Sequence, residues 1–144
     1  MDIRIREMND ADAKTVCVLS KQLGYAVPEE NTVAQILLIN NSSNDAAYVA
    51  VHDNEVIAWI HIFLALHLKL QPFCEVAALV VEERYRGKGV GKILLEKAVE
   101  WTNGKNCKRL MIRSNVRRKE AHQFYLNIGF KEIKQQKIFE LTLI

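Results

Sequence analysis

The chain has 144 residues and a formal net charge of +3, from 20 Lys and Arg against 17 Asp and Glu. Hydrophobic residues make up 49% and charged residues 26%, a balance that excludes an intrinsically disordered chain. The length is that of one domain with one core, so we expect a single domain over residues 1–144, and the charge is too small to argue for a nucleic-acid partner.

The first residues, MDIRIREMND, are charged and lack the apolar core of a secretory signal. The longest uncharged apolar stretch, residues 56–66, is interrupted by His61 and is about half the length of a bilayer span. We therefore expect a soluble cytoplasmic protein without membrane contact. Three widely spaced cysteines form no metal-binding pair and no disulfide framework, which predicts small buried thiols: Cys17, Cys74 and Cys107.

The N-terminal half alternates between strand and helix patterns. DIRIRE has the period of two that a strand shows, and Asn9 or Asp10 is a suitable cap for a following helix that ends at Gly24. A second short helix is predicted after Pro28. AAYVAV and VIAWIHIFLAL, joined by an HDNE turn, predict a hairpin, and FCEVAALVV is apolar on both faces, which predicts a strand inside the sheet.

The C-terminal half continues with a helix that starts in a glycine-rich loop and shows apolar residues at helical spacing: Val90, Leu94, Ala98 and Trp101. KRLMIRS is the next strand, a helix closed by Gly129 follows, and FKEIKQQ and KIFELTLI are two further strand candidates. The pattern predicts an α/β (α+β) fold, with a mixed, largely antiparallel central sheet of about six to seven strands flanked by about four helices.

The loop EERYRGKGVGK connects a strand to a helix, so unpaired backbone N–H groups and the positive end of the helix dipole meet there. A phosphate group is the ligand that such a site favours. A Walker A loop is excluded because Arg86 stands where its first glycine belongs and Ile93 follows Lys92. A dinucleotide fingerprint is excluded because Lys92 occupies its last glycine position.

The remaining match is Arg86-Gly87-Lys88-Gly89-Val90-Gly91, of the form [Q/R]-x-x-G-x-[G/A]. Together with IRSNVRRKEAHQFYLNIGF, it resembles the GCN5-related N-acetyltransferases, whose element order the chain also follows. The overall pattern is similar to small single-domain members grouped with aminoglycoside N-acetyltransferases. The resemblance implies acetyl-CoA as cosubstrate, with its pyrophosphate on the loop and its pantetheine arm along a splayed strand. The cofactor-binding residues it implies are Leu79, Val80, Val81, Arg86, Gly87, Lys88, Gly89, Val90, Gly91, Lys92, Asn115 and Arg118.

Acetyl transfer requires a neutral amine, yet an alkyl ammonium with a pKa of about 10.4 is neutral in only about one molecule in 2,500 at pH 7. A base must therefore accept a proton, and the departing thiolate needs a proton donor. Tyr125 matches the family's position for the donor. Glu75, the one carboxylate of its strand, is the candidate base, and strict alternation would place it on one face with Ala77, Leu79 and Val81. An exposed Glu at a strand start is the alternative.

Two departures from the family pattern leave questions open. The family's strand-end Asn precedes the Tyr by seven positions, which falls on Arg118, while Asn115 lies three residues earlier. Either residue can fill that position. The stretch RLMIRS also lacks the acid that ribosomal-protein N-terminal acetyltransferases carry, which argues against a protein N-terminus as acceptor.

The expected function is transfer of an acetyl group to a primary amine of a small molecule, such as an aminoglycoside or a polyamine, in a ternary complex. The first two helices, with Glu29 and Glu30, would meet the acceptor, and His61 and His67 are secondary candidates for its cleft. The four histidines have no ligand spacing, so no metal is expected. A protein or peptide acetyltransferase, a silent acyl-CoA sensor and a nucleic-acid module are alternatives, and monomer and homodimer both stay open.

Overall fold

A computed structural model describes all 144 residues, in two compact parts that are presented separately, residues 1–113 and 114–144. The first part contains one sheet with the strand order β1-β2-β3-β4-β5. Its elements, besides two short 3-10 turns, are β1 (Arg4–Glu7), α1 (Ala13–Lys21), α2 (Glu29–Asn40), β2 (Asp45–His52), β3 (Glu55–Ala65), β4 (Phe73–Val81), α3 (Val90–Gly104) and β5 (Leu110–Ile112).

The sheet is mixed and largely antiparallel, as predicted. Strands β1 to β4 pair antiparallel with their neighbours, and only β5 runs parallel to β4. Strand β4 lies between β3 and β5, which explains why its sequence is apolar on both faces. The α/β fold class is therefore confirmed, with five strands where six to seven were expected.

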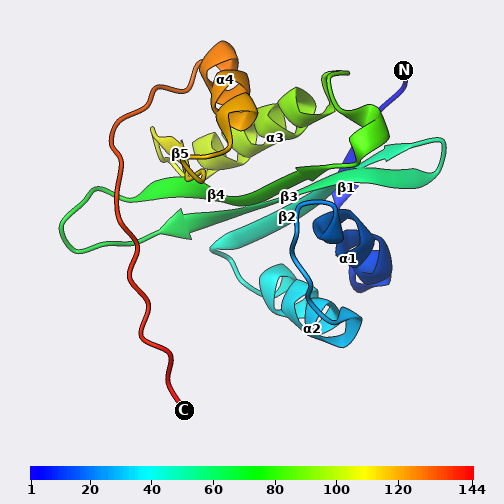
Figure 1. Cartoon of the computed structure of the whole chain (residues 1–144), viewed down its shortest axis with the longest axis horizontal. Helices are drawn as coiled ribbons and strands as arrows, with labels where there is room; N and C mark the ends of the chain where they lie inside the picture. The colour runs from blue at the N-terminus through cyan, green and yellow to red at the C-terminus, as the bar shows by residue number, and fades with distance from the viewer. The chain divides into compact units, whose positions relative to one another are not determined.

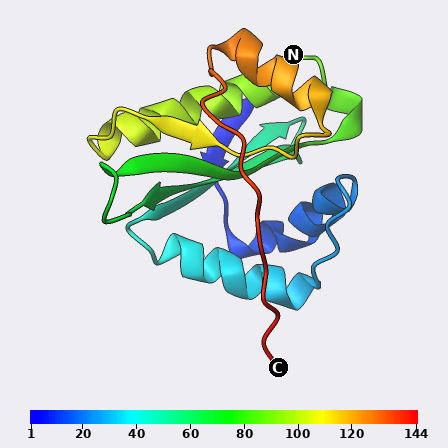
Figure 2. The ribbon, with the colours of Figure 1, turned by 60° about the vertical axis from the view of Figure 1, so that its left-hand side comes forward.

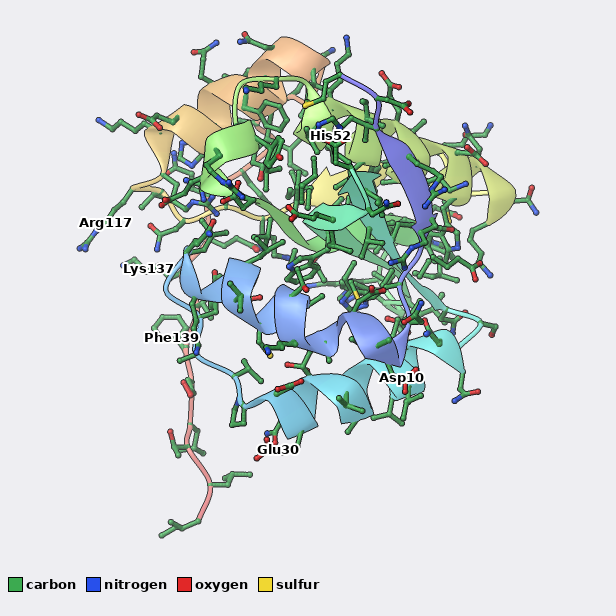
Figure 3. All side chains as sticks on the ribbon, turned by 90° about the vertical axis from the view of Figure 1, so that its right-hand side faces the viewer. Asp10, Glu30, His52, Arg117, Lys137 and Phe139 are labelled. Carbon is green, nitrogen blue, oxygen red and sulfur yellow. The ribbon has the colours of Figure 1, made fainter.

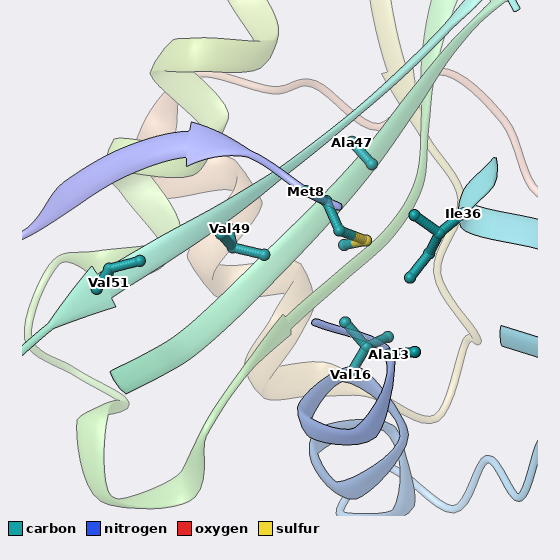
Figure 4. Close-up of a cluster of buried hydrophobic side chains, with 7 residues drawn as sticks. All are labelled: Met8, Ala13, Val16, Ile36, Ala47, Val49 and Val51. Atoms are coloured by element: carbon teal, nitrogen blue, oxygen red, sulfur yellow. The ribbon is translucent and has the colours of Figure 1, made fainter. Parts of the chain in front are cut away.

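Helices α1 and α2 cover one face of the sheet and α3 covers the other (Figure 1). A buried apolar cluster joins the first two helices to β2 (Figure 4); its members are Met8, Ala13, Val16, Ile36, Ala47, Val49 and Val51. On the opposite face, Leu94, Leu95 and Ala98 of α3 are buried. The three cysteines are free and buried, as the sequence predicted. No helix has both the length and the apolar character that crossing a bilayer would need.

Local sequence signals explain two of the connections. Asn9 caps the turn before α1: its side chain accepts a hydrogen bond from Ala11 N, while Asp12 accepts one from Asn9 N at 2.9 Å. The β2–β3 hairpin turns at Asp53 and Asn54, whose φ values of 49° and 63° are those of a two-residue type I′ turn. Asn and Asp tolerate this left-handed backbone better than other non-glycine residues do.

The second part contains helix α4 (Lys119–Ile128), which ends at Gly129 with a φ of 123°. The stretches FKEIKQQ and KIFELTLI form no strand, so the prediction of two C-terminal strands is wrong for this structure; residues 130–144 run without helix or strand (Figure 2). A period-two pattern indicates that a segment favours an extended conformation. A strand forms only where a neighbouring strand supplies hydrogen-bond partners for its backbone N–H and C=O groups.

Candidate active site

Strand β4 extends beyond the region in which it pairs with β5. The parallel ladder joins Cys74 to Leu110 and ends at Val76 and Ile112, while β4 continues to Val81. Beyond Val76, no strand pairs with β4 on this edge, along the predicted pantetheine stretch. That stretch comprises Leu79, Val80 and Val81, of which Val80 is buried and the other two are half-buried.

A β-bulge interrupts β4 at the same point. Ala78 lies opposite His61 and Val76 lies opposite Ile62, so Ala77 has no partner on β3. The extra residue reverses the alternation of side chains. Glu75 therefore shares a face with Ala78, and the prediction that it shares one with Leu79 and Val81 is wrong. Its face is the one that α1 and α2 cover.

The Glu75 side chain is only 11% exposed and forms a salt bridge, in which Arg113 Nε donates to Glu75 Oε1 at 3.1 Å. A carboxylate can be buried at this level because a cation at the end of β5 compensates its charge. The alternative of an exposed Glu at a strand start is therefore excluded. Glu75 lies two residues before the bulge, opposite Phe63 of β3.

The glycine loop has the backbone that its sequence predicts. Gly87 and Gly89 have φ values of 76° and 85°, a region that side chains with a Cβ rarely adopt. Gly89 precedes α3 without any side-chain cap, and the first helical hydrogen bond runs from Ile93 N to Gly89 O. The N–H groups in between consequently point out of the helix end with no partner inside the helix.

The cations of the loop differ in their contacts. Arg86 Nε donates to Val81 O at 3.0 Å and so fastens the loop to the end of β4. Arg84 Nε is paired with Glu82 at 3.0 Å, and Lys88 Nζ lies 5.8 Å from the centre of the Tyr85 ring. Lys92 is exposed, whereas Val90 and Gly91 are buried and anchor the first turn of α3.

The second part, residues 114–144, contains the three remaining predicted site residues, Asn115, Arg118 and Tyr125. Asn115 forms a turn just before α4, in which its side chain accepts from Arg117 N at 2.9 Å and its carbonyl accepts from Arg118 N. Arg118 occupies the N-cap position of α4 without a side-chain hydrogen bond to the helix, and Tyr125 packs edge-on against Phe130. Partial burial raises the pKa of Tyr125, and the Arg118 charge opposes this effect. The phenol, whose ordinary pKa is about 10, is protonated at neutral pH.

One polar arrangement on the Glu75 face was not predicted as a unit. His61 Nε2 lies 2.8 Å from Asp45 Oδ1, and Ser42 donates to the other carboxylate oxygen at 2.8 Å. His61 was only a secondary candidate, and Asp45 was not considered. The hairpin register could have predicted the pair, because Asp45 and His61 lie on neighbouring strands, two positions apart on one face.

Two cavities lie away from most of the predicted residues. The larger, of about 730 Å³, lies between the ends of β1 and α2 and the starting end of β2, and no predicted site residue lines it. The smaller, of about 110 Å³, lies under α2, where His61 and Trp59 line it. The indole Nε1 of Trp59 is buried without a hydrogen-bond partner.

The family model of the acetyltransferase (GNAT) family matches residues 15–130. The chain belongs to this family. The match includes β4, the glycine loop and α4, so the predicted elements of a GNAT acetyltransferase lie inside the matched region. The expectation of an acetyl-CoA-dependent N-acetyltransferase is confirmed at the level of the family.

Similar proteins differ in their named acceptors. The aminoalkylphosphonate N-acetyltransferase of Salmonella typhimurium is 28% identical over 128 residues, which are 88% of this chain and 80% of that protein. N-alpha-acetyltransferase 30 of Xenopus laevis is 27% identical over 96 residues, 67% of this chain but only 34% of that protein. Among solved structures, an aminoglycoside N-acetyltransferase, AAC(6')-Iy in complex with CoA, has a TM-score of 0.87 at 19% identity, covering 99% of this chain and 96% of that one. The last comparison shows the shared fold.

Proposed function

We propose that this GNAT protein transfers the acetyl group of acetyl-CoA to a primary amine of a small molecule. The observation that carries the proposal is the course of β4: one of its edges has no strand partner after Val76, and the strand leads through the glycine loop to the N-terminus of α3, which no side chain caps. An extended pantetheine arm fits this edge as an added strand would, and a pyrophosphate fits the N–H groups of the loop.

The loop residues match this cosubstrate in detail. Gly87 and Gly89 have no atom within 4 Å of an added Cβ, so their surface is open for a phosphate to approach the backbone. Arg86, Lys88 and Lys92 add positive charge around the same turn, and Arg84 and Lys88 would meet the outer phosphate. Asn115 or Arg118 would contribute a further cofactor contact from the start of α4.

Glu75 is the proposed base. Acetyl-CoA supplies an activated acetyl group as a thioester, and the attacking amine must lose a proton as its C–N bond forms. The Glu75 carboxylate would take this proton, directly or through a water molecule. Its salt bridge with Arg113 holds the carboxylate in place beside the bulge.

Tyr125 is the proposed proton donor to the departing CoA thiolate. A phenol is protonated at neutral pH, which is the form that a general acid needs. The C–S bond of the thioester breaks as the thiolate leaves, and the phenol proton neutralises it. The tyrosinate then recovers its proton from solvent.

A small-molecule acceptor is favoured over a protein N-terminus by the absence of an acid in RLMIRS. Two of the three relatives described above are named for small-molecule amines, an aminoalkylphosphonate and an aminoglycoside. The Xenopus relative, in contrast, is matched over a third of its length. Peptides therefore belong in the test as the competing acceptor class.

The test is a thiol-release assay with acetyl-CoA and a panel of aminoglycosides, aminoalkylphosphonates, polyamines, amino acids and N-terminal peptides. We expect turnover with at least one small-molecule amine. The variant Tyr125→Phe should lower kcat by about 10²- to 10⁴-fold, the usual contribution of a general acid. Glu75→Gln should remove the acid limb from the pH profile of kcat/KM for the amine.

The matched control is Glu96→Gln, since Glu96 is exposed on α3 and lies outside the proposed site. It should not change the rate. Turnover with peptides alone would contradict the acceptor class, and CoA binding without turnover would favour a silent sensor. An unchanged pH profile in Glu75→Gln would show that another group is the base.

A further inference from the structure

Acetylation of an ammonium ion removes two protons from its nitrogen. The first must leave before the nitrogen has a lone pair with which to attack, and the second leaves as the C–N bond forms. Glu75 is the proposed acceptor of the second proton. The first is held more tightly, because an alkyl ammonium is a weak acid, and it calls for a stronger base than a carboxylate. Imidazole is the side chain that supplies such a base near neutral pH.

His61 has the geometry of an imidazole base held by a carboxylate. Its Nε2 lies 2.8 Å from Asp45 Oδ1, and Ser42 donates to the other carboxylate oxygen at 2.8 Å. An ionised carboxylate only accepts hydrogen bonds, so Nε2 carries the proton of the neutral ring and Nδ1 keeps its lone pair. Nδ1 has no hydrogen-bond partner in the protein, and the side chain is 23% exposed. The lone pair of Nδ1 is therefore available to a substrate.

His61 also lies on the face of the sheet that carries Glu75. Its partner across the β3–β4 ladder is Ala78, directly after the bulge, while Glu75 lies opposite Phe63, two positions further along β3. Diagonal positions of this kind are roughly 7–8 Å apart on a sheet. Side chains at that spacing can contact one amine nitrogen between them.

The charges around the imidazole suit a proton acceptor. Asp45 faces it from β2, and Glu75, which is already paired with Arg113, is its acidic neighbour on β4. From α1 and α2, only uncharged side chains line the small cavity beside His61. An imidazolium formed by proton transfer is therefore compensated by Asp45, as in other pairs of histidine and carboxylate.

We propose that, in the acetyl transfer proposed above, His61 accepts the first proton of the acceptor ammonium at Nδ1 and passes it to solvent. One N–H bond of the ammonium breaks and one forms at Nδ1. The neutral amine then attacks the thioester and gives its second proton to Glu75, while the thiolate takes a proton from Tyr125. Asp45 is a positioning residue, because it acts through His61.

The kinetic test compares wild type with His61→Gln between pH 7 and about pH 9.5, using the amine of the panel above that gives the highest turnover. Gln can still donate to Asp45 but cannot accept a proton, so the variant depends on the neutral fraction of the amine. That fraction rises about tenfold per pH unit below the pKa of the amine. We expect kcat/KM for the amine to be about 10²-fold lower than wild type at pH 7, and the deficit to shrink below about tenfold at the upper end.

The matched control is His52→Gln. His52 is also half-buried beside an aspartate, Asp53, but lies at the opposite end of β2 from Asp45 (Figure 3). It should leave the pH profile unchanged. A deficit of His61→Gln that is constant with pH would show a structural role and overturn the proposal, although turnover by the wild type would still support acetyl transfer. A wild type that acetylates no amine would overturn the proposed function and this role with it.

Nitrogen NMR of the imidazole rings tests the same role without turnover. At about pH 8, we expect neutral His61 with its proton on Nε2 and a bare Nδ1. A proton on Nδ1 of the neutral ring would overturn the proposal even in an active enzyme, because the lone pair would then face Asp45. This measurement uses the wild type and does not depend on the folding of a variant.

Discussion

At the scale of single residues, the buried carboxylates of this protein are paired with arginines that compensate their charge. Arg6 donates two hydrogen bonds of 2.9 Å to the two carboxylate oxygens of Asp12, one to each, and Asn9 N adds a third hydrogen bond to Asp12. Burial opposes ionisation of Asp12, but these donors outweigh it and hold its pKa below the ordinary value. The same logic explains Glu75, which is buried beside Arg113.

The Arg6–Asp12 pair should contribute measurably to stability. We expect Asp12→Asn to lower the free energy of unfolding by about 1–3 kcal/mol at pH 7, because Arg6 loses a charged bidentate acceptor. Urea unfolding followed by circular dichroism measures this. Asp10→Asn, an exposed acid in the same turn, is the control and should change stability by less than about 0.5 kcal/mol.

The pH dependence of the same pair has a definite sign. Because the folded-state pKa of Asp12 is depressed, its contribution is complete above the unfolded pKa of about 3.9 and is lost as the pH falls through the folded value. The difference in stability between wild type and Asp12→Asn should therefore shrink below about pH 4. A difference that stays constant down to pH 2 would contradict this assignment.

At the scale of elements, the strand–loop–helix unit of β4 and α3 combines three local irregularities. The Ala77 bulge changes the facing of side chains, the end of the β4–β5 ladder leaves one edge of β4 without a strand partner, and two left-handed glycines turn the chain into α3. Each is locally unfavourable compared with regular structure. Their clustering in about fifteen residues is typical of a functional site.

A substitution at Gly89 tests whether this strand–loop–helix unit binds CoA. Gly89→Ala places a Cβ at a φ of 85°, which should cost about 1–2 kcal/mol of stability and weaken CoA binding by roughly tenfold or more. The matched control is Gly104→Ala, at an exposed position in the last turn of α3 where φ is not positive, which should leave CoA binding unchanged. Calorimetric titration with CoA compares the two. Equal affinities would show that the loop does not hold the cosubstrate.

At the scale of the whole molecule, a ligand that binds only the folded chain should stabilise it. With free CoA at 100 times its dissociation constant, the expected gain is about 2.7 kcal/mol, which corresponds to an increase of several degrees in Tm. Thermal unfolding with and without CoA measures this shift. Adenosine at the same concentration, which lacks both pyrophosphate and pantetheine, is the control and should give a much smaller shift.

Much of the fold and the backbone of the glycine loop could be predicted from local sequence. The Asn9 cap, the hairpin, the glycine loop and the end of α4 at Gly129 are decided by residues within a few positions of each other, and the structure has them where the patterns predict. Helix α1, in contrast, ends at Lys21, before the predicted end at Gly24. The spacing of the glycines and the residue after Lys92 excluded two other phosphate loops. These features are readable because backbone conformation and helix ends depend on neighbouring residues.

Features that depend on pairing between distant segments were decided only by the tertiary structure. The face of Glu75 was predicted wrongly because a bulge at Ala77 is a property of the β3–β4 register and has no marker in FCEVAALVV. Its salt bridge with Arg113 and the contact of His61 with Asp45 likewise join residues 38 and 16 positions apart. KIFELTLI shows the same limit, since its sequence determines an extended apolar chain, whereas a strand also requires a neighbour, and that neighbour is not encoded locally.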